Sequence, residues 1–222
     1  MNIRIGTRSL FFGIHQVVLH PLFVALGWWK LYGFPFDPRL WTAFFVHDLG
    51  YFGKPNMDGP EGEQHPLVGA AIMGWLFDTA AKVPNPSLAG RTLGRLLEYI
   101  FGSGDSITGN MSWRHFTLYH SRYMARQHAA PFSRLCVADK YAIVLVPRWL
   151  YLFQTCLTGE IHEYMAVAAA RNLAGSPGGK LDISTQGTTD MVVWHRILSG
   201  FMRKWVDEHR DLSHDNWLPA KE

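Results

Sequence analysis

The sequence predicts an all-α protein. Apolar residues recur at spacings of three and four along most of the chain, whereas the apolar and polar alternation of half-buried strands is rare. Capping residues before these segments and glycines after them are typical helix boundaries. With 222 residues and a hydrophobic fraction of 48%, the chain is long and apolar enough to form one domain, 1–222, with a substantial core.

The first two expected helices lead up to an adjacent histidine and aspartate. One covers 8–33, with Pro21 as a point where it can bend and Gly33 as its stop. The other starts at Asp37, a suitable N-cap with Pro38 at the first helical position, and ends at the His-Asp pair. Further helices are expected over 65–80, 85–105, 112–127, 131–146 and 191–210, with Gly- and Pro-rich loops at 51–64 and 175–190.

The composition limits the kinds of partner. The formal charge of +3 is mild, and the 21 Lys and Arg are scattered along the chain. We therefore expect a small anionic substrate and no extended nucleic acid. The two cysteines, Cys136 and Cys156, show no CxxC spacing, which indicates a reducing compartment and a cytoplasmic location.

The uncharged stretch between Arg8 and Lys30 is long enough for a membrane span. It contains His15, His20 and Pro21, which a lipid-facing helix would carry at considerable cost, so a buried core helix is the better interpretation. The histidines also interrupt the apolar run that a secretory signal would need. We expect no membrane span.

Polar side chains interrupt several apolar helical segments. His47 and Asp48 directly follow an apolar run, and burying a carboxylate beside an imidazole is costly unless the pair binds a metal or serves chemistry. Imidazole and carboxylate suit Mn, Fe, Co, Ni or Zn, and the candidate ligands exceed the need of one tetrahedral ion. We therefore expect two divalent ions with Asp48 as the bridge. The candidate ligands are His20, His47, Asp48, His65, His120 and Asp139.

In this order, the candidate ligands resemble those of the HD-domain superfamily of metal-dependent phosphohydrolases. The matching stretches are HPLFVALGWW, WTAFFVHDLGY, HPLVGAAIM, LYHSRYMARQ and SRLCVADKYA, which lie within residues 13–150. The resemblance implies an HD-domain helical bundle with metal ligands at its centre, and residues 151–222 would form a helical extension. It also implies hydrolysis of a phosphate ester or anhydride, often of a nucleotide.

Details of the pattern narrow the resemblance. Because the chain contains both His65 and His120, its ligand pattern resembles that of the dinuclear branch of the superfamily. The GYP signature of the cyclic-di-GMP phosphodiesterases is absent after His120, so that substrate is not supported. The chain is also shorter than the large dNTP triphosphohydrolases and lacks room for their extra helices.

The expected mechanism is attack by metal-activated water on phosphorus, with Asp48 and His65 as catalytic residues. Lys54, in the loop after the His-Asp pair, is a further catalytic candidate. Several basic residues are expected to bind substrate, although basic residues more often form surface salt bridges. On an ideal helix, Arg122 would point away from His120. The substrate-binding candidates are Arg122, Arg126, Arg134 and Lys140.

Other histidines compete for the ligand positions. His15 and His115 each precede a proposed ligand by five residues, about 140° around a helix, so neither pair shares a metal easily. We expect His20 and His120 to be the ligands, and His15 and His115 to be core or supporting residues. His128 is also expected in the core. Surface or supporting positions are expected for His162, His195, His209 and His214.

Two other classes of function stay open. Some dinuclear HD proteins hold two irons and cleave C–C or C–P bonds with dioxygen, and they use this ligand set. A non-catalytic nucleotide-binding module is the other alternative, and missing ligands would favour it. Aromatic residues near the candidate site, including Tyr51 and Tyr119, could stack a base, but a core role is the better interpretation.

Overall fold

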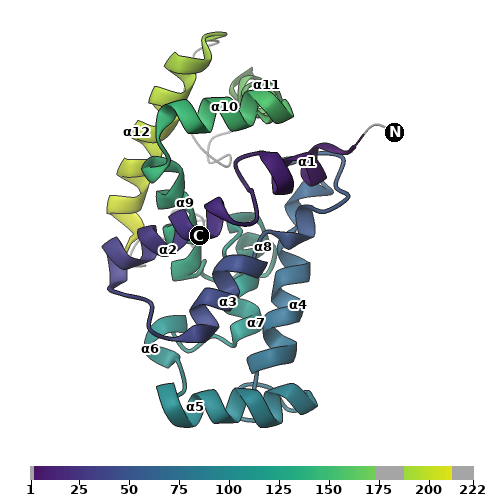
Figure 1. Cartoon of the computed structure of the whole chain (residues 1–222), viewed down its shortest axis with the longest axis vertical. Coiled ribbons are helices and arrows are strands. Elements are labelled where there is room, and N and C mark those ends of the chain that lie inside the picture. The colour runs from purple at the N-terminus through teal and green to yellow at the C-terminus, as the bar shows by residue number, and fades with distance from the viewer. Residues whose placement is uncertain (1–2, 174–187, 212–222) are drawn as a thin grey trace, which may run out of the picture.

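A computed structural model describes residues 3–173 and 188–211, and within these ranges the chain is helical with no strand (Figure 1). The all-α prediction is therefore confirmed. None of the described helices has the length and hydropathy that a membrane crossing needs.

The described helices are short, and the ones that carry the site lie in the middle of the molecule. Two 3₁₀ turns, η1 (Leu49–Tyr51) and η2 (Gly62–Gln64), lie between α3 and α4, and a π turn, η3 (Gly90–Gly94), precedes α5. The helices are α1 (Ile5–Phe12), α2 (Leu19–Tyr32), α3 (Pro38–Val46), α4 (Pro66–Phe77), α5 (Arg95–Phe101), α6 (Asp105–Thr108), α7 (Trp113–Leu118), α8 (Arg122–Gln127), α9 (Arg134–Leu145), α10 (Arg148–Thr158), α11 (Glu160–Leu173) and α12 (Met191–His209).

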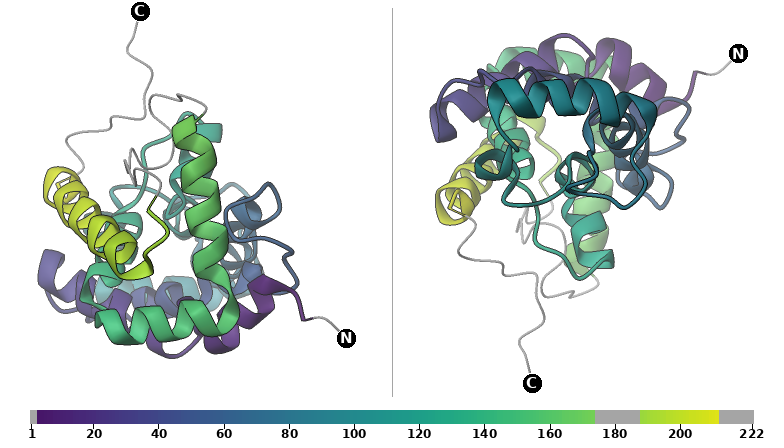
Figure 2. Two further views of the ribbon diagram at one scale, coloured as in Figure 1. Left: turned by 90° about the horizontal axis from the view of Figure 1, so that it is seen from above. Right: turned by 90° about the horizontal axis from the view of Figure 1, so that it is seen from below.

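The central bundle consists of α2, α3, α4, α7 and α9, with α2 packed on α9 and α4 packed on α7. Its core is built around large side chains that are almost fully buried, such as Trp28, Phe44, Phe116 and Leu135. Figure 1 shows α10 and α11 at one end of the molecule and α5 across the other, and α12 runs along one side, where it packs on α9; the two views of Figure 2 look onto these ends. Residues distant in sequence therefore surround the middle of the bundle.

Helix α3 begins as the sequence predicts. The Asp37 carboxylate accepts a hydrogen bond from the Arg39 backbone N–H at 2.9 Å, and Pro38 occupies the first turn. The same carboxylate pairs with the buried Arg39 guanidinium at 2.7 Å, and that guanidinium also donates to the carbonyl of Gly102 near α5. The start of α3 is thereby fixed, and its end delivers His47 and Asp48 to the centre.

The prediction of one continuous helix over 8–33 is wrong, because the chain leaves helical geometry between α1 and α2. A Cβ at Gly13 would lie 1.8 Å from the Glu160 carboxylate oxygen, so the backbone passes this side chain closely. The Gln16 side chain accepts the Val18 and Leu19 backbone N–H groups and starts α2 anew. Pro21 therefore lies in a first turn, where it causes no bend.

The helix predicted over 112–127 is also divided. Helix α7 starts at the predicted cap Ser112 but ends at Leu118, and Ser121 then caps α8 by accepting the Met124 backbone N–H at 3.3 Å. His120 consequently lies in the break between two helices. The predicted helix at 191–210 is confirmed as α12, capped by Asp190, whereas most of the loop predicted at 175–190 lies outside the described residues.

Candidate metal centre

The structure brings all the predicted metal ligands together at the centre of the bundle. His20 lies in the first turn of α2, His47 and Asp48 follow α3, and Asp139 lies in α9. His65 directly precedes α4, and His120 lies between α7 and α8. All of these side chains are buried, with exposures from 1% to 8%. They form two groups that share Asp48.

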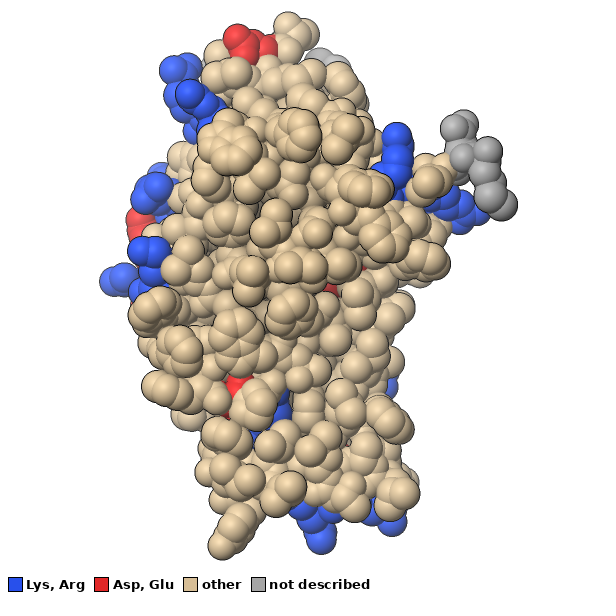
Figure 3. Space-filling view, viewed as in Figure 1, with Lys and Arg blue, Asp and Glu red and all other residues tan. Residues whose placement is uncertain are grey.

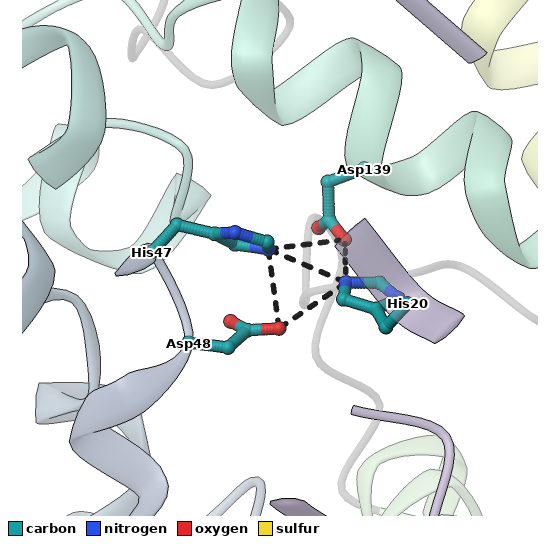
Figure 4. Close-up of side chains that lie close together, drawn as sticks. All are labelled: His20, His47, Asp48 and Asp139. Atoms are coloured by element: carbon teal, nitrogen blue, oxygen red, sulfur yellow. Dashed lines mark hydrogen bonds and ion pairs between the residues drawn. The ribbon is translucent and has the colours of Figure 1, made fainter. Parts of the chain in front are cut away.

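The first group contains four ligands. His20 Nε2 lies 3.2 Å from Asp48 Oδ2, 3.1 Å from Asp139 Oδ1 and 3.3 Å from His47 Nε2. Figure 4 shows these four side chains pointing toward a common centre from three separate elements. Ligand atoms that surround one ion at about 2.1 Å lie about 3.0–3.4 Å apart, so these spacings suit a single divalent cation.

The second group contains three ligands and uses the other oxygen of the same carboxylate. His65 Nε2 and His120 Nε2 each lie 3.4 Å from Asp48 Oδ1, and 3.1 Å from one another. Two imidazoles and one carboxylate leave coordination positions open for water or substrate. The bridging position predicted for Asp48 therefore matches the geometry.

Two glycines let the segments of the centre approach each other. A Cβ at Gly50 would lie 2.0 Å from the carbonyl oxygen of His65, and a Cβ at Gly69 would lie 2.4 Å from the carbonyl oxygen of Val46. Neither distance is compatible with a larger residue at an unchanged backbone. The backbone of η1 therefore contacts the start of α4 directly, which places His65 opposite Asp48.

Backbone carbonyls fix the orientation of three imidazoles. Nδ1 of His47 donates to the carbonyl of Phe44, and Nδ1 of His65 and of His120 donate to the carbonyls three residues before them, at 2.6–2.9 Å. Because a carbonyl can only accept, each Nδ1 carries a proton, and in the neutral ring each Nε2 then presents a lone pair to the centre. Converging lone pairs repel one another unless a cation lies between them, so this donor set fits a metal ion.

The electrostatics agree with that interpretation. Burial lowers the pKa of His65 and of His120, which keeps both imidazoles neutral and able to bind a metal. Burial alone would raise the pKa of Asp48, but the neighbouring imidazoles, led by His47, hold it well below its usual range. Burial would lower the pKa of His20, but its hydrogen bonds with Asp139 and Asp48 raise it to about 9. A bound cation would take the place of that proton.

A cavity of about 170 Å³ opens onto both groups of ligands. Several lining residues were not predicted as site residues, and those with ionisable side chains are His15, Tyr51, Asp58, Glu63, Tyr151 and Tyr164. The sequence favoured a core role for Tyr51. The residue is indeed buried, but its ring also stacks on the His65 ring, with the two centroids 4.0 Å apart. Asp58 and Glu63 lie in the predicted loop 51–64, between the candidate ligands Asp48 and His65. This position in the sequence was the one indication that they could lie near the site.

The structure separates the predicted catalytic and substrate-binding cations into two sets. Arg122 and Lys140 line the cavity, and Lys140 Nζ lies 2.8 Å from Asp139 Oδ2. Arg122 faces the cavity because the helix predicted through His120 is broken. Lys54, Arg126 and Arg134 do not line it; Arg134 instead donates to the carbonyl of Ser106.

The remaining histidines show which choices the structure supports. His115 is exposed, stacks on Tyr119 and lies outside both ligand groups, so choosing His120 agrees with the geometry. The core position expected for His115 and His128 is wrong, because both side chains are exposed. His15 lies outside both groups but near His20, with ring centroids 5.5 Å apart.

Of the positions expected at the surface or in support of the site, His162 is exposed, and His214 lies outside the described residues. His195 and His209 are buried, which excludes a surface position, and they pack on Tyr151 and Trp205 respectively.

Comparison with known proteins adds no assignment: no family model, no curated protein and no solved structure matches this chain. The case for the centre therefore depends on its residues and their geometry.

We expect the purified protein to bind two divalent transition-metal ions per chain. Asp48→Ala removes a ligand of both groups, so it should abolish firm binding of both ions. His65→Ala or His120→Ala leaves the four-ligand group complete and should lose one ion. Metal analysis after equilibration with Mn²⁺ and desalting measures each content.

His115→Ala is the matched control, because it removes an exposed imidazole outside both ligand groups. It should retain both ions. One ion in the unsubstituted protein, with the same content in His65→Ala, would contradict the two-group interpretation.

Alanine substitutions of the neighbouring residues His15 and His20 should have different effects on metal binding and on stability. His20→Ala should weaken metal binding at least about tenfold, whereas His15→Ala should keep the metal content. His15 lies 2.9 Å from the Ser9 hydroxyl and 3.8 Å from the buried Glu160 carboxylate, so its loss should cost about 1–3 kcal/mol of unfolding free energy. Metal titration and thermal unfolding of both variants provide the comparison. Metal loss in His15→Ala alone would reverse the assignment.

Proposed function

We propose that this chain is a member of the HD-domain superfamily and acts as a metal-dependent phosphohydrolase on a phosphate ester or anhydride. The observation that carries the proposal is the pair of ligand groups sharing Asp48, in the residue order of that superfamily. Both groups open on one cavity that also contains cationic side chains. Two divalent ions bound there would lower the pKa of a water and neutralise charge on the phosphoryl oxygens.

The charge of the cavity supports an anionic substrate. Four carboxylates against Arg122, Lys140 and the protonated His20 leave the metal-free lining with one net negative charge, and two divalent ions that replace the His20 proton would change this to two net positive charges. Such a cavity attracts a phosphate only after metal binding, so substrate affinity should depend on the metal content. The charged lining residues in this count are Asp48, Asp58, Glu63, Asp139, Arg122, Lys140 and His20.

Lys140 and Arg122 are the residues suited to hold the phosphate. The ion pair with Asp139 raises the pKa of Lys140 despite its burial, so the ammonium group stays charged. The Arg122 guanidinium is supported by the Trp205 ring, 4.8 Å from the ring centroid, and reaches the same cavity from α8. Both cations would bind phosphate oxygens that are not coordinated by metal. Lys54 has no part in this proposal, because it does not line the cavity.

One feature favours a second candidate, a di-iron oxygenase. The group formed by Asp48, His65 and His120 has the two-histidine, one-carboxylate composition found in non-haem iron oxygenases. The same six ligands would then hold two irons and cleave a C–C or C–P bond with dioxygen. A non-catalytic module is less favoured, because all the predicted ligands converge.

The source of the incorporated oxygen separates the two reactions. A hydrolase takes its nucleophile from water, so turnover should proceed without air and survive replacement of iron by Mn²⁺ or Co²⁺. In ¹⁸O-labelled water, mass spectrometry should find the label in the released phosphate or in the phosphate of the shortened product. Turnover that needs iron and consumes dioxygen, with oxygen from the gas entering a carbon product, would instead establish the oxygenase.

A further inference from the structure

The cavity above the metal centre has two chemically different walls. The ligands, the carboxylates and the two cations form one wall. The other wall comes from α9 to α12 and is almost entirely apolar and aromatic, although it belongs to the same cavity. Its principal residues are Ile143, Tyr151, Tyr164, Trp194, Leu198 and Met202.

This apolar wall is a built feature of the C-terminal helices. Trp194, Leu198 and Met202 are spaced by four residues, which places them on one face of α12, and each is 3–4% exposed. Tyr151 of α10 is 2% exposed and packs in the same hydrophobic cluster. These residues lie in the extension beyond residue 150, outside the segment that resembles the HD domains. The extension therefore shapes the space beside the metal centre.

The apolar wall offers no side-chain carbonyl or amide group to a ligand, and its polar atoms are the hydroxyls of Tyr151 and Tyr164 and the indole N–H of Trp194, which is buried without a hydrogen-bond partner. No Asn or Gln side chain is present among the described residues of the lining. Tyr164 already donates its hydroxyl to Glu160 at 3.2 Å. A nucleobase and a ribose would bring several donors and acceptors to this wall, and each one left without a partner costs about 1–3 kcal/mol. An apolar ring would instead be buried favourably there.

We propose that the cavity selects phosphate monoesters of apolar, ring-bearing alcohols or phenols over nucleotides. The phosphate lies at the metal wall, near Lys140 and Arg122, and the organic group lies against Tyr151, Trp194 and Met202. This inference rests on the proposed function for the placement of the phosphate. It narrows the substrate class, because the nucleotide expected from the resemblance fits the apolar wall poorly.

Binding of non-hydrolysable phosphonates tests the selection without turnover. Calorimetric titration of the Mn²⁺-loaded full chain compares phenylphosphonate with methylphosphonate and with a nucleoside 5′-phosphonate. All three carry the same head group, so differences report the organic part. We expect phenylphosphonate to bind at least about tenfold more tightly than either of the others.

Ala168 provides a variant that fills the apolar side of the cavity without removing a ligand. It lies in α11, is half-buried and lines the cavity, so Ala168→Phe should occupy the space of the phenyl group. The affinity for phenylphosphonate should fall at least about tenfold, while that for methylphosphonate stays within about twofold. Ala166→Phe makes the same change at an exposed position of the same helix and should alter neither affinity.

The outcomes distinguish this inference from the proposed function. Preferential binding of phenylphosphonate that Ala168→Phe removes supports the inference, even if the protein hydrolyses no phosphate ester and the proposed function fails. Equal or tighter binding of the nucleoside phosphonate overturns the inference, even if phosphate esters are hydrolysed. A phenyl preference that survives Ala168→Phe overturns the assigned wall. Equal binding of phenylphosphonate and methylphosphonate also overturns the inference.

Discussion

The carboxylate of Asp48 is the group around which the centre is arranged. One of its oxygens faces His20 and His47, and the other faces His65 and His120. These imidazoles come from four different parts of the chain, so a single side chain relates α2, α3, α4 and the break after α7. Removing it would leave two groups of histidines with no shared anion, deep in an apolar bundle.

Burying such a set of polar side chains is unfavourable unless each finds a partner. The protein meets part of this cost internally, because the backbone carbonyls of Phe44, Gly62 and Thr117 accept the Nδ1 protons. The opposite ring nitrogens converge on one another and on the Asp48 carboxylate, whose Oδ2 is buried without a hydrogen-bond partner. This donor set could hold metal ions, which would complete the arrangement. The proposals about phosphate chemistry and about substrate selection both depend on this conclusion.

Local sequence signals predicted the parts of the structure that depend on neighbouring residues. The Asp37 cap, the position of the His-Asp pair after α3 and the amphipathic α12 follow from capping and periodicity, and the six candidate ligands followed from polar residues in apolar segments. The breaks at Gly13 and Ser121 were missed because they depend on a contact with distant Glu160 and on a cap inside an apolar-periodic segment. Periodicity alone continues through both.

The cavity could not be predicted for the same reason. Its apolar wall comes from residues more than 100 positions after His20, and nothing in the spacing of Trp194 or Tyr151 indicates that they line a cavity with the candidate ligands. Likewise, the break at His120 turned Arg122 toward the cavity, contrary to the ideal-helix expectation. Among the five basic residues expected to serve the site, only the fold distinguishes Arg122 and Lys140 from the others.

The shared role of Asp48 is tested most directly by anomalous diffraction from crystals of the Mn²⁺-loaded protein. The account predicts two anomalous peaks, one bounded by His20, His47 and Asp139 and the other by His65 and His120, with one oxygen of Asp48 next to each. A single peak, or two peaks of which one has no contact with Asp48, would contradict it.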